Sequence, residues 1–200
     1  MTKEQNPWST YEVAKHHGYL NNISYESEAT NHHKPFSNFI SKTFGKQKVS
    51  ILDFGCGNAR VLEVLNSNSI TNYFGLDVNK YSLQKATEKY SEIKKYKFIV
   101  SDLNNFVATT KVDVVYIDST LTMLEEPYKI LSQTLNISDI IFINRTPLFK
   151  KEEKSIYVWG GMQENSTNWK FSKKNIKKFS KVNNLEFNLL GSERFTLIKK

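Results

Sequence analysis

The stretch Val49-Ser-Ile-Leu-Asp-Phe-Gly-Cys-Gly-Asn-Ala-Arg60 decides the fold of this chain. Its first half is an apolar run that predicts a buried strand near 49–54, and the run ends in the glycine loop Gly55-Cys56-Gly57. A strand that turns through glycines into a helix leaves backbone N–H groups facing an open crevice, and glycines let a ligand approach the main chain closely. The stretch therefore predicts a Rossmann-like α/β domain that binds a nucleotide cofactor at the loop.

The acids around the loop indicate which cofactor it is. Apolar runs contain or end in Asp53, Asp77, Asp102 and Asp118. Asp77 follows the first glycine at the spacing at which a Rossmann-type fold offers a carboxylate to ribose hydroxyls. Arg60 replaces the third glycine of a dinucleotide fingerprint. Four carboxylates would repel a pyrophosphate but suit S-adenosylmethionine, which carries a sulfonium and an ammonium. The open alternative is a Rossmann-like domain without a cofactor.

Length and composition fit one cytoplasmic domain. The chain has 200 residues, enough to bury a sizeable core. Its one cysteine, Cys56, excludes a disulfide within the chain and is expected to be a small loop filler. The residues Met1–Pro7 lack the apolar core of a signal peptide, and no apolar run has the roughly 18 residues of a membrane span. No cysteine cluster or spaced histidine pair predicts a metal site.

The charge is unevenly placed. The net charge is +8, and residues 144–200 supply the excess with 13 Lys and Arg against 5 Asp and Glu. Only Arg60, Arg145 and Arg194 are arginines, although arginine is the usual bidentate reader of phosphate and guanine. A solvated lysine face and an anion-binding face both remain open. We do not expect nucleic acid as a partner, and we leave the oligomeric state open.

Strands and helices alternate along the chain. Strands are expected near 49–54, 73–78, 97–101, 112–118 and 139–144, and helices near 58–67, 81–90, 103–109 and from Glu125 onward. This order predicts right-handed crossovers and a parallel, doubly wound sheet. A β-prone run follows at 155–159, then a polar stretch to Trp169. Ser172 is expected to cap a helix with the apolar stripe Ile176, Phe179 and Val182, before a terminal hairpin around Gly191.

The glycine loop and strand-end acids resemble those of the class I S-adenosylmethionine-dependent methyltransferases. The resemblance rests on Asp53–Gly57, Gly75–Asp77, Ser101-Asp102 and Val112–Asp118. It implies a seven-stranded sheet of order 3-2-1-4-5-7-6, with strand 7 antiparallel. It also implies a cofactor-binding domain over 46–200, and we expect residues 1–45 to form an N-terminal helical and aromatic lid.

A narrower resemblance concerns the segments 8–14, 118–128 and 143–148. They are similar to a family of small methyltransferases encoded among bacterial surface-polysaccharide genes. That similarity implies a small-molecule acceptor, a sugar or sugar nucleotide of polysaccharide biosynthesis.

The broader resemblance implies a set of cofactor contacts. Asp77 would accept hydrogen bonds from both ribose hydroxyls, and Asp102 would accept one from the adenine amino group. Val78 would pack on the adenine face. The whole set is Asp53, Gly55, Cys56, Gly57, Asp77, Val78, Asp102, Leu103, Asp118 and Ser119.

No catalytic motif is secure in this sequence. Methyl transfer is an in-line displacement that depends mainly on holding donor and acceptor in line, so a base is not always needed. The weak candidates for a base are His16, His17 and Asp118, followed by His32, His33, Tyr11 and Tyr19. The candidate acceptor side comprises Tyr11, Tyr19, Arg145, Tyr157 and Trp159. Two alternatives stay open: an RNA-directed methyltransferase that uses the basic C-terminal face, and a non-catalytic S-adenosylmethionine-binding protein.

Overall fold

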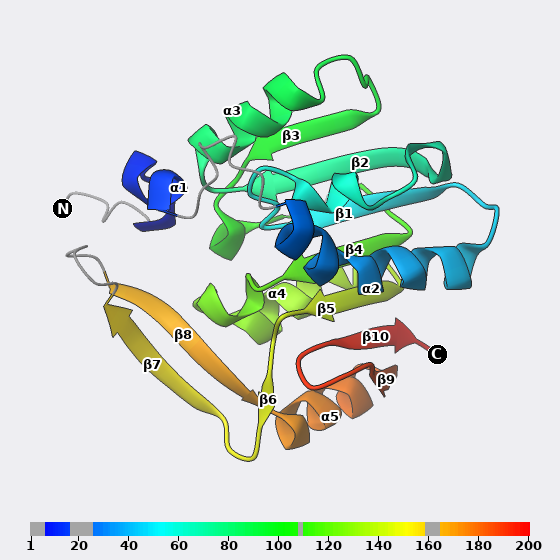
Figure 1. Ribbon diagram of the computed structural model, residues 1–200. Helices are drawn as coiled ribbons and strands as arrows, with labels where there is room; N and C mark the ends of the chain where they lie inside the picture. Colours follow the sequence, from blue (N-terminus) through cyan, green and yellow to red (C-terminus); the bar gives the residue numbers. More distant parts are fainter. Residues whose placement is uncertain (1–6, 17–25, 108–109, 159–164) are drawn as a thin grey trace. The chain divides into compact units, whose positions relative to one another are not determined.

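The computed structural model describes residues 7–16, 26–107, 110–158 and 165–200, and its architecture is mixed α/β (Figure 1). The strands are β1 (Val49–Phe54), β2 (Ile70–Asp77), β3 (Tyr96–Val100), β4 (Val114–Asp118), β5 (Ile140–Asn144), β6 (Leu148–Phe149), β7 (Glu153–Val158), β8 (Asn165–Ser172), β9 (Leu185–Leu189) and β10 (Phe195–Lys199). The α-helices are α1 (Tyr11–His16), α2 (Glu26–Phe44), α3 (Lys80–Lys89), α4 (Pro127–Thr134) and α5 (Lys173–Val182). Short 3-10 helices are η1 (Pro7–Ser9), η2 (Arg60–Glu63), η3 (Ser67–Ser69), η4 (Leu103–Asn105) and η5 (Leu121–Met123). The chain divides into two compact units, Met1–Leu103 and Asn104–Lys200.

The first unit is built on three parallel strands in the order β3-β2-β1. Its core includes Ile51 and Phe54 of β1, which are fully buried, and Leu83 and Ala86 of α3. Helix α3 contacts both β2 and β3. The side chain of Asn79 caps α3, because its Oδ1 accepts hydrogen bonds from the backbone of the first turn. This cap fixes the helix directly after the C-terminal end of β2.

The second unit contains parallel β4 and β5, and β10 runs antiparallel to both β5 and β9. Every residue of β4 is buried, as is typical of a strand covered on both faces. Helix α4 begins with Pro127 in its first turn and buries Ile130 and Leu131. Ser172 caps α5 as expected, since its Oγ accepts from the backbone N–H of Asn175 at 3.1 Å.

The sheet has seven strands in the order β3-β2-β1-β4-β5-β10-β9. In this sheet β9 and β10 are the sixth and seventh strands along the chain, and β10 is antiparallel to its neighbours. The predicted Rossmann-like fold of order 3-2-1-4-5-7-6 is therefore confirmed.

A second sheet, of order β6-β8-β7, lies between β5 and α5 in sequence. We expected a strand near 155–159 followed by a polar stretch, whereas residues 165–172 form β8, antiparallel to β7. The pairing satisfies the backbone groups of this polar segment. Trp169 of β8 stacks on Phe171, and its indole Nε1 donates to the carbonyl of Leu124 at 2.9 Å. The hydrogen bond to Leu124 attaches the small sheet to the rest of its unit.

Two of the helix predictions, those for residues 58–67 and 103–109, are wrong. The region 58–67 forms only η2 and η3, because Ala59 adopts a left-handed backbone (φ 59°) and the side chain of Asn66 accepts from Asn68 N. Such local side-chain bonds compete with helix formation. The region 103–109 forms only η4 within its described part. The apolar stripe of α5 is also wrong at one position, since Val182 is 76% exposed.

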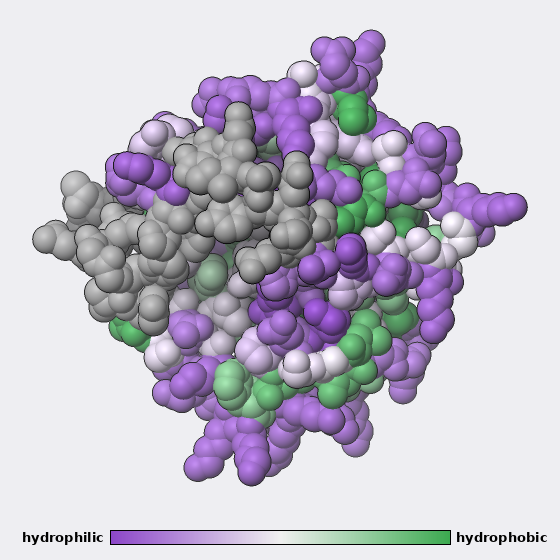
Figure 2. All heavy atoms as spheres, viewed as in Figure 1, coloured by the Kyte–Doolittle hydropathy of each residue, from purple (hydrophilic) through white to green (hydrophobic). Residues whose placement is uncertain are grey.

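No helix in the described ranges is long and apolar enough to cross a membrane. Hydrophilic side chains cover much of the face that Figure 2 shows. The five lysines of α5 are exposed, and none of them forms an ion pair with another described residue; they are Lys173, Lys174, Lys177, Lys178 and Lys181.

Candidate functional site

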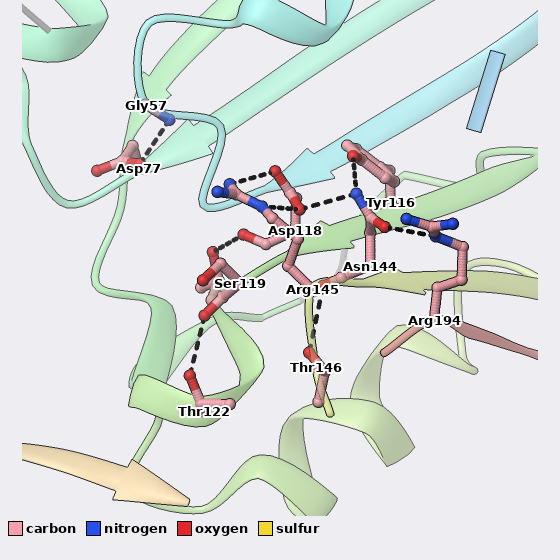
Figure 3. Close-up of polar contacts among 11 residues, drawn as sticks. Gly57, Asp77, Tyr116, Asp118, Ser119, Thr122, Asn144, Arg145, Thr146 and Arg194 are labelled. Atoms are coloured by element: carbon pink, nitrogen blue, oxygen red, sulfur yellow. Dashed lines mark hydrogen bonds and ion pairs between the residues drawn. The ribbon is translucent and has the colours of Figure 1, made fainter. Parts of the chain in front are cut away.

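Asp77 is held at the C-terminal end of β2 by two backbone donors. Its Oδ2 accepts from Gly57 N at 2.8 Å (Figure 3). Its Oδ1 accepts from Asn79 N, also at 2.8 Å. Burial raises the pKa of Asp77 above its ordinary 3.8, and the backbone hydrogen bonds oppose that shift. Each carboxylate oxygen can accept more than one hydrogen bond. Asp77 is therefore oriented by the main chain and retains the capacity to accept ligand hydroxyls.

The glycine loop is fastened to β2 by its own backbone. The N–H groups of Gly55 and Cys56 both donate to Leu76 O, at 2.8 and 2.9 Å. Gly55 and Gly57 have φ of 82° and 54°, a left-handed conformation that glycine adopts without strain. The loop is thus a preformed backbone surface beside Asp77.

Gly75 of β2 makes room for this loop. A Cβ at this position would lie 2.8 Å from Cys56 Sγ and 3.0 Å from Phe98 Cδ1. The Cys56 side chain therefore occupies the space above Gly75, as expected of a small filler. Burial, and then the charges of Asp53 and Asp77, raise the pKa of the Cys56 thiol well above 9.0. The thiolate needed for nucleophilic chemistry is disfavoured.

Asp53 points into the core of the first unit. Its Oδ2 accepts from the hydroxyl of Tyr73 at 2.5 Å, and both residues are buried. Burial, and then the charge of Asp53, raise the pKa of Tyr73 well above 10.0, so the hydroxyl stays protonated and donates. The pair fixes the strand end from which the loop departs, which fits the orienting role expected of Asp53.

Asn79 joins the N-terminal segment to the Asp77 region. Its Nδ2 donates to the carbonyls of Trp8 and Thr10, at 2.7 and 2.9 Å. The ring of Tyr11, a predicted acceptor residue, is 49% exposed and packs edge-on against Tyr81 of α3. The described segment η1–α1 therefore lies beside the residues that follow Asp77. That residues 1–45 act as a lid remains a prediction.

In the second unit, Asp118 ends β4 and takes part in a hydrogen-bonded cluster (Figure 3). Arg145 donates to it through Nε at 2.8 Å and through Nη2 at 2.6 Å, and Asn144 Nδ2 donates at 3.0 Å. A carboxylate engaged by a guanidinium fork is a poor general base, because it would have to break that pair to take a proton. Asp118 is better suited to positioning Arg145.

The remaining predicted residues are distributed as follows. Val78 is half-buried, Asp102 is exposed and Leu103 is buried. Ser119 has a left-handed backbone (φ 60°), and its carbonyl accepts from the hydroxyl of Thr122 at 3.0 Å. The structure describes the backbone of Tyr157, in β7, without its side chain, and Trp159 lies outside the described residues.

Two of the four candidate histidines have side chains that the structure describes. His16 ends α1, and its side chain is not described; His17 and Tyr19 lie outside the described residues. On α2, His32 is exposed and His33 is buried. Within the described ranges no group of three or more metal-binding side chains occurs.

Four residues of these clusters were missed by the sequence reasoning: Tyr73, Asn79, Asn144 and Arg194. Asn144 ends an apolar run, and Asn79 lies two positions after the strand-end acid Asp77. A polar residue at such a position signals a helix cap or a ligand contact. Tyr73 and Arg194 carry no such signal, since their partners are distant in sequence.

Residues 45–170 match a family model described as a methyltransferase domain. No curated protein sequence matches the chain. The magnesium protoporphyrin IX methyltransferase of Synechocystis PCC 6803 with bound SAM is 11% identical, with a TM-score of 0.70 over 98% of this chain and 95% of that one. The N-terminal domain of EvdMO1, solved in the presence of SAH and D-fucose, is 14% identical, with a TM-score of 0.62 over 88% of this chain and 82% of that one. The plantazolicin methyltransferase BpumL, in complex with a monoazolic desmethylPZN analogue and SAH, is 26% identical, with a TM-score of 0.53 over 68% of this chain and 54% of that one.

Proposed function

Because this chain belongs to the methyltransferase domain family and uses S-adenosylmethionine as its cofactor, we propose that it methylates a small sugar or sugar nucleotide. The proposed setting is the biosynthesis of a surface polysaccharide in the cytoplasm, a compartment that suits a chain with a single cysteine.

The geometry around Asp77 carries the cofactor part of the proposal. An aspartate at the end of β2, oriented by Gly57 N and Asn79 N, offers charged acceptors to a vicinal diol such as ribose. The left-handed glycines beside it expose backbone without a Cβ. Val78, half-buried at the next position, offers an apolar surface for the adenine. These features fit S-adenosylmethionine, which supplies an electrophilic methyl group on sulfur when bound.

Two observations support a sugar-like acceptor. The exposed ring of Tyr11 on α1 offers an apolar face to the C–H groups of a sugar. The N-terminal domain of EvdMO1, which shares the fold, was solved in the presence of SAH and D-fucose. Relatives in fold also include methyltransferases named for magnesium protoporphyrin IX and for plantazolicin, so the acceptor is the part of the proposal that an experiment must decide.

The test is a product assay on the full chain. Purified protein is incubated with S-adenosylmethionine and a panel of sugar nucleotides, and the sugar nucleotides are examined by mass spectrometry. We expect at least one of them to gain the mass of one methylene together with an equal amount of S-adenosylhomocysteine. Binding of S-adenosylhomocysteine without methylation of any sugar or sugar nucleotide would refute the proposed acceptor and leave the cofactor assignment intact.

The exposed lysines of α5 allow a matched test of the RNA alternative. Lys173, Lys174 and Lys177 are changed together to Gln. If these lysines form only a solvated face, methylation of the sugar nucleotide stays nearly unchanged and weak, salt-sensitive RNA binding disappears. An RNA complex of the unmodified chain that persists at about 200 mM salt, together with RNA methylation, would favour the alternative.

A further inference from the structure

Two of the three arginines of this chain are linked through a buried asparagine, Asn144, and its partner Asp118. Arg194 donates from Nε to Asn144 Oδ1 at 3.1 Å, and Asn144 in turn donates from Nδ2 to Asp118 Oδ1 at 3.0 Å. Asp118 holds Arg145 through the two-bond fork described above. Figure 3 shows the resulting chain of contacts, in which Asn144 and Asp118 link the two guanidinium groups.

The supports of this cluster are buried, but an arginine reaches solvent. Asn144 and Tyr116, whose hydroxyl also receives a hydrogen bond from Asn144 Nδ2 at 3.2 Å, are fully buried. The side chain of Asp118 is 7% exposed, whereas that of Arg145 is 39% exposed. Buried hydrogen-bond partners therefore hold Arg145 in place while part of its side chain remains exposed to solvent.

Among the described residues, the cluster holds more arginines than carboxylates. A structural ion pair needs one arginine for one carboxylate, whereas here two arginines accompany Asp118. Among the described residues, the side chain of Arg194 has no ion-pair partner, and its only hydrogen bond is the one to Asn144. Lysine supplies 25 of the 28 basic residues, yet both positions are arginine. Arginine differs from lysine in offering a planar fork that fixes its direction and matches a carboxylate or phosphate.

The cluster lies at the edge of the sheet where α/β proteins bind ligands. Asp118 and Asn144 are paired residues at the C-terminal ends of parallel β4 and β5, and ligands occupy the crevice beyond such ends. Phe195 pairs with Ile143, so Arg194 comes to the same edge. The backbone is strained there, since Ser119 and Arg145 directly follow the two strands with φ of 60° and 48°. Strain of this kind in residues other than glycine concentrates at binding and catalytic sites.

We propose that Arg145 binds an anionic group of the methyl acceptor, a carboxylate or a phosphate. Asp118 is the positioning residue that aims Arg145, and Arg194 supplies the positive charge that keeps the cluster from being neutral. The proposal rests on the proposed function and narrows it: the acceptor is an acidic sugar or a sugar phosphate rather than a neutral sugar.

The test measures anion binding directly, by titration calorimetry on the full chain saturated with S-adenosylhomocysteine. Inorganic pyrophosphate is the phosphate probe and D-glucuronate is the carboxylate probe. The variants are Arg145→Gln, Arg145→Lys and Arg194→Gln. The control Lys174→Gln removes the same charge as Arg145→Gln, but from an exposed position on α5.

We expect at least one probe to bind, and the one that binds identifies the anion. Arg145→Gln should weaken that binding about tenfold or more, the effect of losing a charge-assisted hydrogen bond. Arg145→Lys should weaken it as well although the net charge is unchanged, because lysine cannot reproduce the fork. Arg194→Gln should weaken it to a smaller extent, and Lys174→Gln should not.

Several results would overturn the proposal. They are binding of neither probe, equal weakening by Lys174→Gln and Arg145→Gln, or full retention of binding in Arg145→Lys. If Arg145→Gln does not fold, Arg145→Lys still tests the proposal, because the lysine leaves a positive charge beside Asp118. Saturation with S-adenosylhomocysteine separates the two proposals. If the protein binds S-adenosylhomocysteine but neither anion, only the proposal of an anion subsite is refuted. Whether the acceptor is a sugar is decided by the methylation assay.

Discussion

Replacing Asp77 by alanine should weaken cofactor binding without unfolding the protein. The carboxylate accepts from Gly57 N and Asn79 N, both at 2.8 Å, and the ribose hydroxyls would donate to the same two oxygens. In Asp77→Ala those hydroxyls lose a charged acceptor at a half-buried position, at a cost of about 1.5–3 kcal/mol of binding free energy. Each 1.4 kcal/mol is a factor of ten, so affinity should fall about 10- to 150-fold.

The fold should survive because the glycine loop has a second attachment. Gly55 N and Cys56 N remain bonded to Leu76 O in the variant, and the cap of α3 is the side chain of Asn79 rather than that of Asp77. The loss of the Gly57 bond loosens the loop, so the reduction in affinity is expected toward the upper end of the range.

The assay is titration calorimetry with S-adenosylhomocysteine, accompanied by urea unfolding to show that each variant is folded. The control is Glu88→Ala on α3, whose carboxylate is exposed and contacts only Lys85 and Gln84 of the same helix among the described residues. That change should leave the dissociation constant nearly unaltered. Equal affinities for Asp77→Ala and Glu88→Ala would refute the placement of the ribose site.

Three further changes have signs that follow from the structure. Since burial raises the pKa of Asp77 above 3.8, S-adenosylhomocysteine affinity should fall as the pH drops through that raised pKa, and the affinity of Asp77→Asn should not change over the same pH range. The stability of the cofactor-free protein should depend on pH in the opposite direction. The contribution of Asp77 to stability is full below its unfolded pKa and is lost as the pH rises through its folded pKa. Tyr73→Phe removes the hydroxyl bonded to buried Asp53 and should lower the free energy of unfolding by about 1.5–3 kcal/mol in urea titrations. The control Tyr90→Phe removes a buried hydroxyl with no hydrogen-bond partner among the described residues and should not lower it. Equal losses in the two variants would contradict the stabilising role of the Tyr73–Asp53 hydrogen bond. Gly75→Ala places a methyl group 2.8 Å from Cys56 Sγ, so it should lower the free energy of unfolding by about 1–3 kcal/mol and weaken S-adenosylhomocysteine binding. Adding Cys56→Ala should restore part of the stability and part of the binding. No recovery in the double variant would show that the clash with the Cys56 sulfur is not the cause.

The sequence by itself determined the local chemistry of this protein. The run Val49–Phe54 before the glycines, the alternation of strands and helices, and the aspartates at the strand ends were sufficient for the Rossmann-like fold class and the cofactor, whereas the strand order was implied by the resemblance to the class I methyltransferases. Such features can be read from one sequence because their physical causes are local: burial of a continuous apolar run, the left-handed backbone of Gly55 and Gly57, and a capping side chain such as Ser172.

Only the tertiary structure decided which side chains serve one another. Asp53 and Asp118 both follow the strand-end pattern, yet one accepts from a core tyrosine 20 positions away and the other from Arg145, 27 positions away. The pairing of β7 with β8 and the approach of Arg194 to Asn144 are equally non-local. Hydrogen bonds and ion pairs depend on distances of about 3 Å and on direction, and these are set by the register of strands and the packing of helices rather than by the order of residues. For this reason the kinds of residue at the site could be predicted from the sequence, whereas the orientation of each carboxylate and arginine could not.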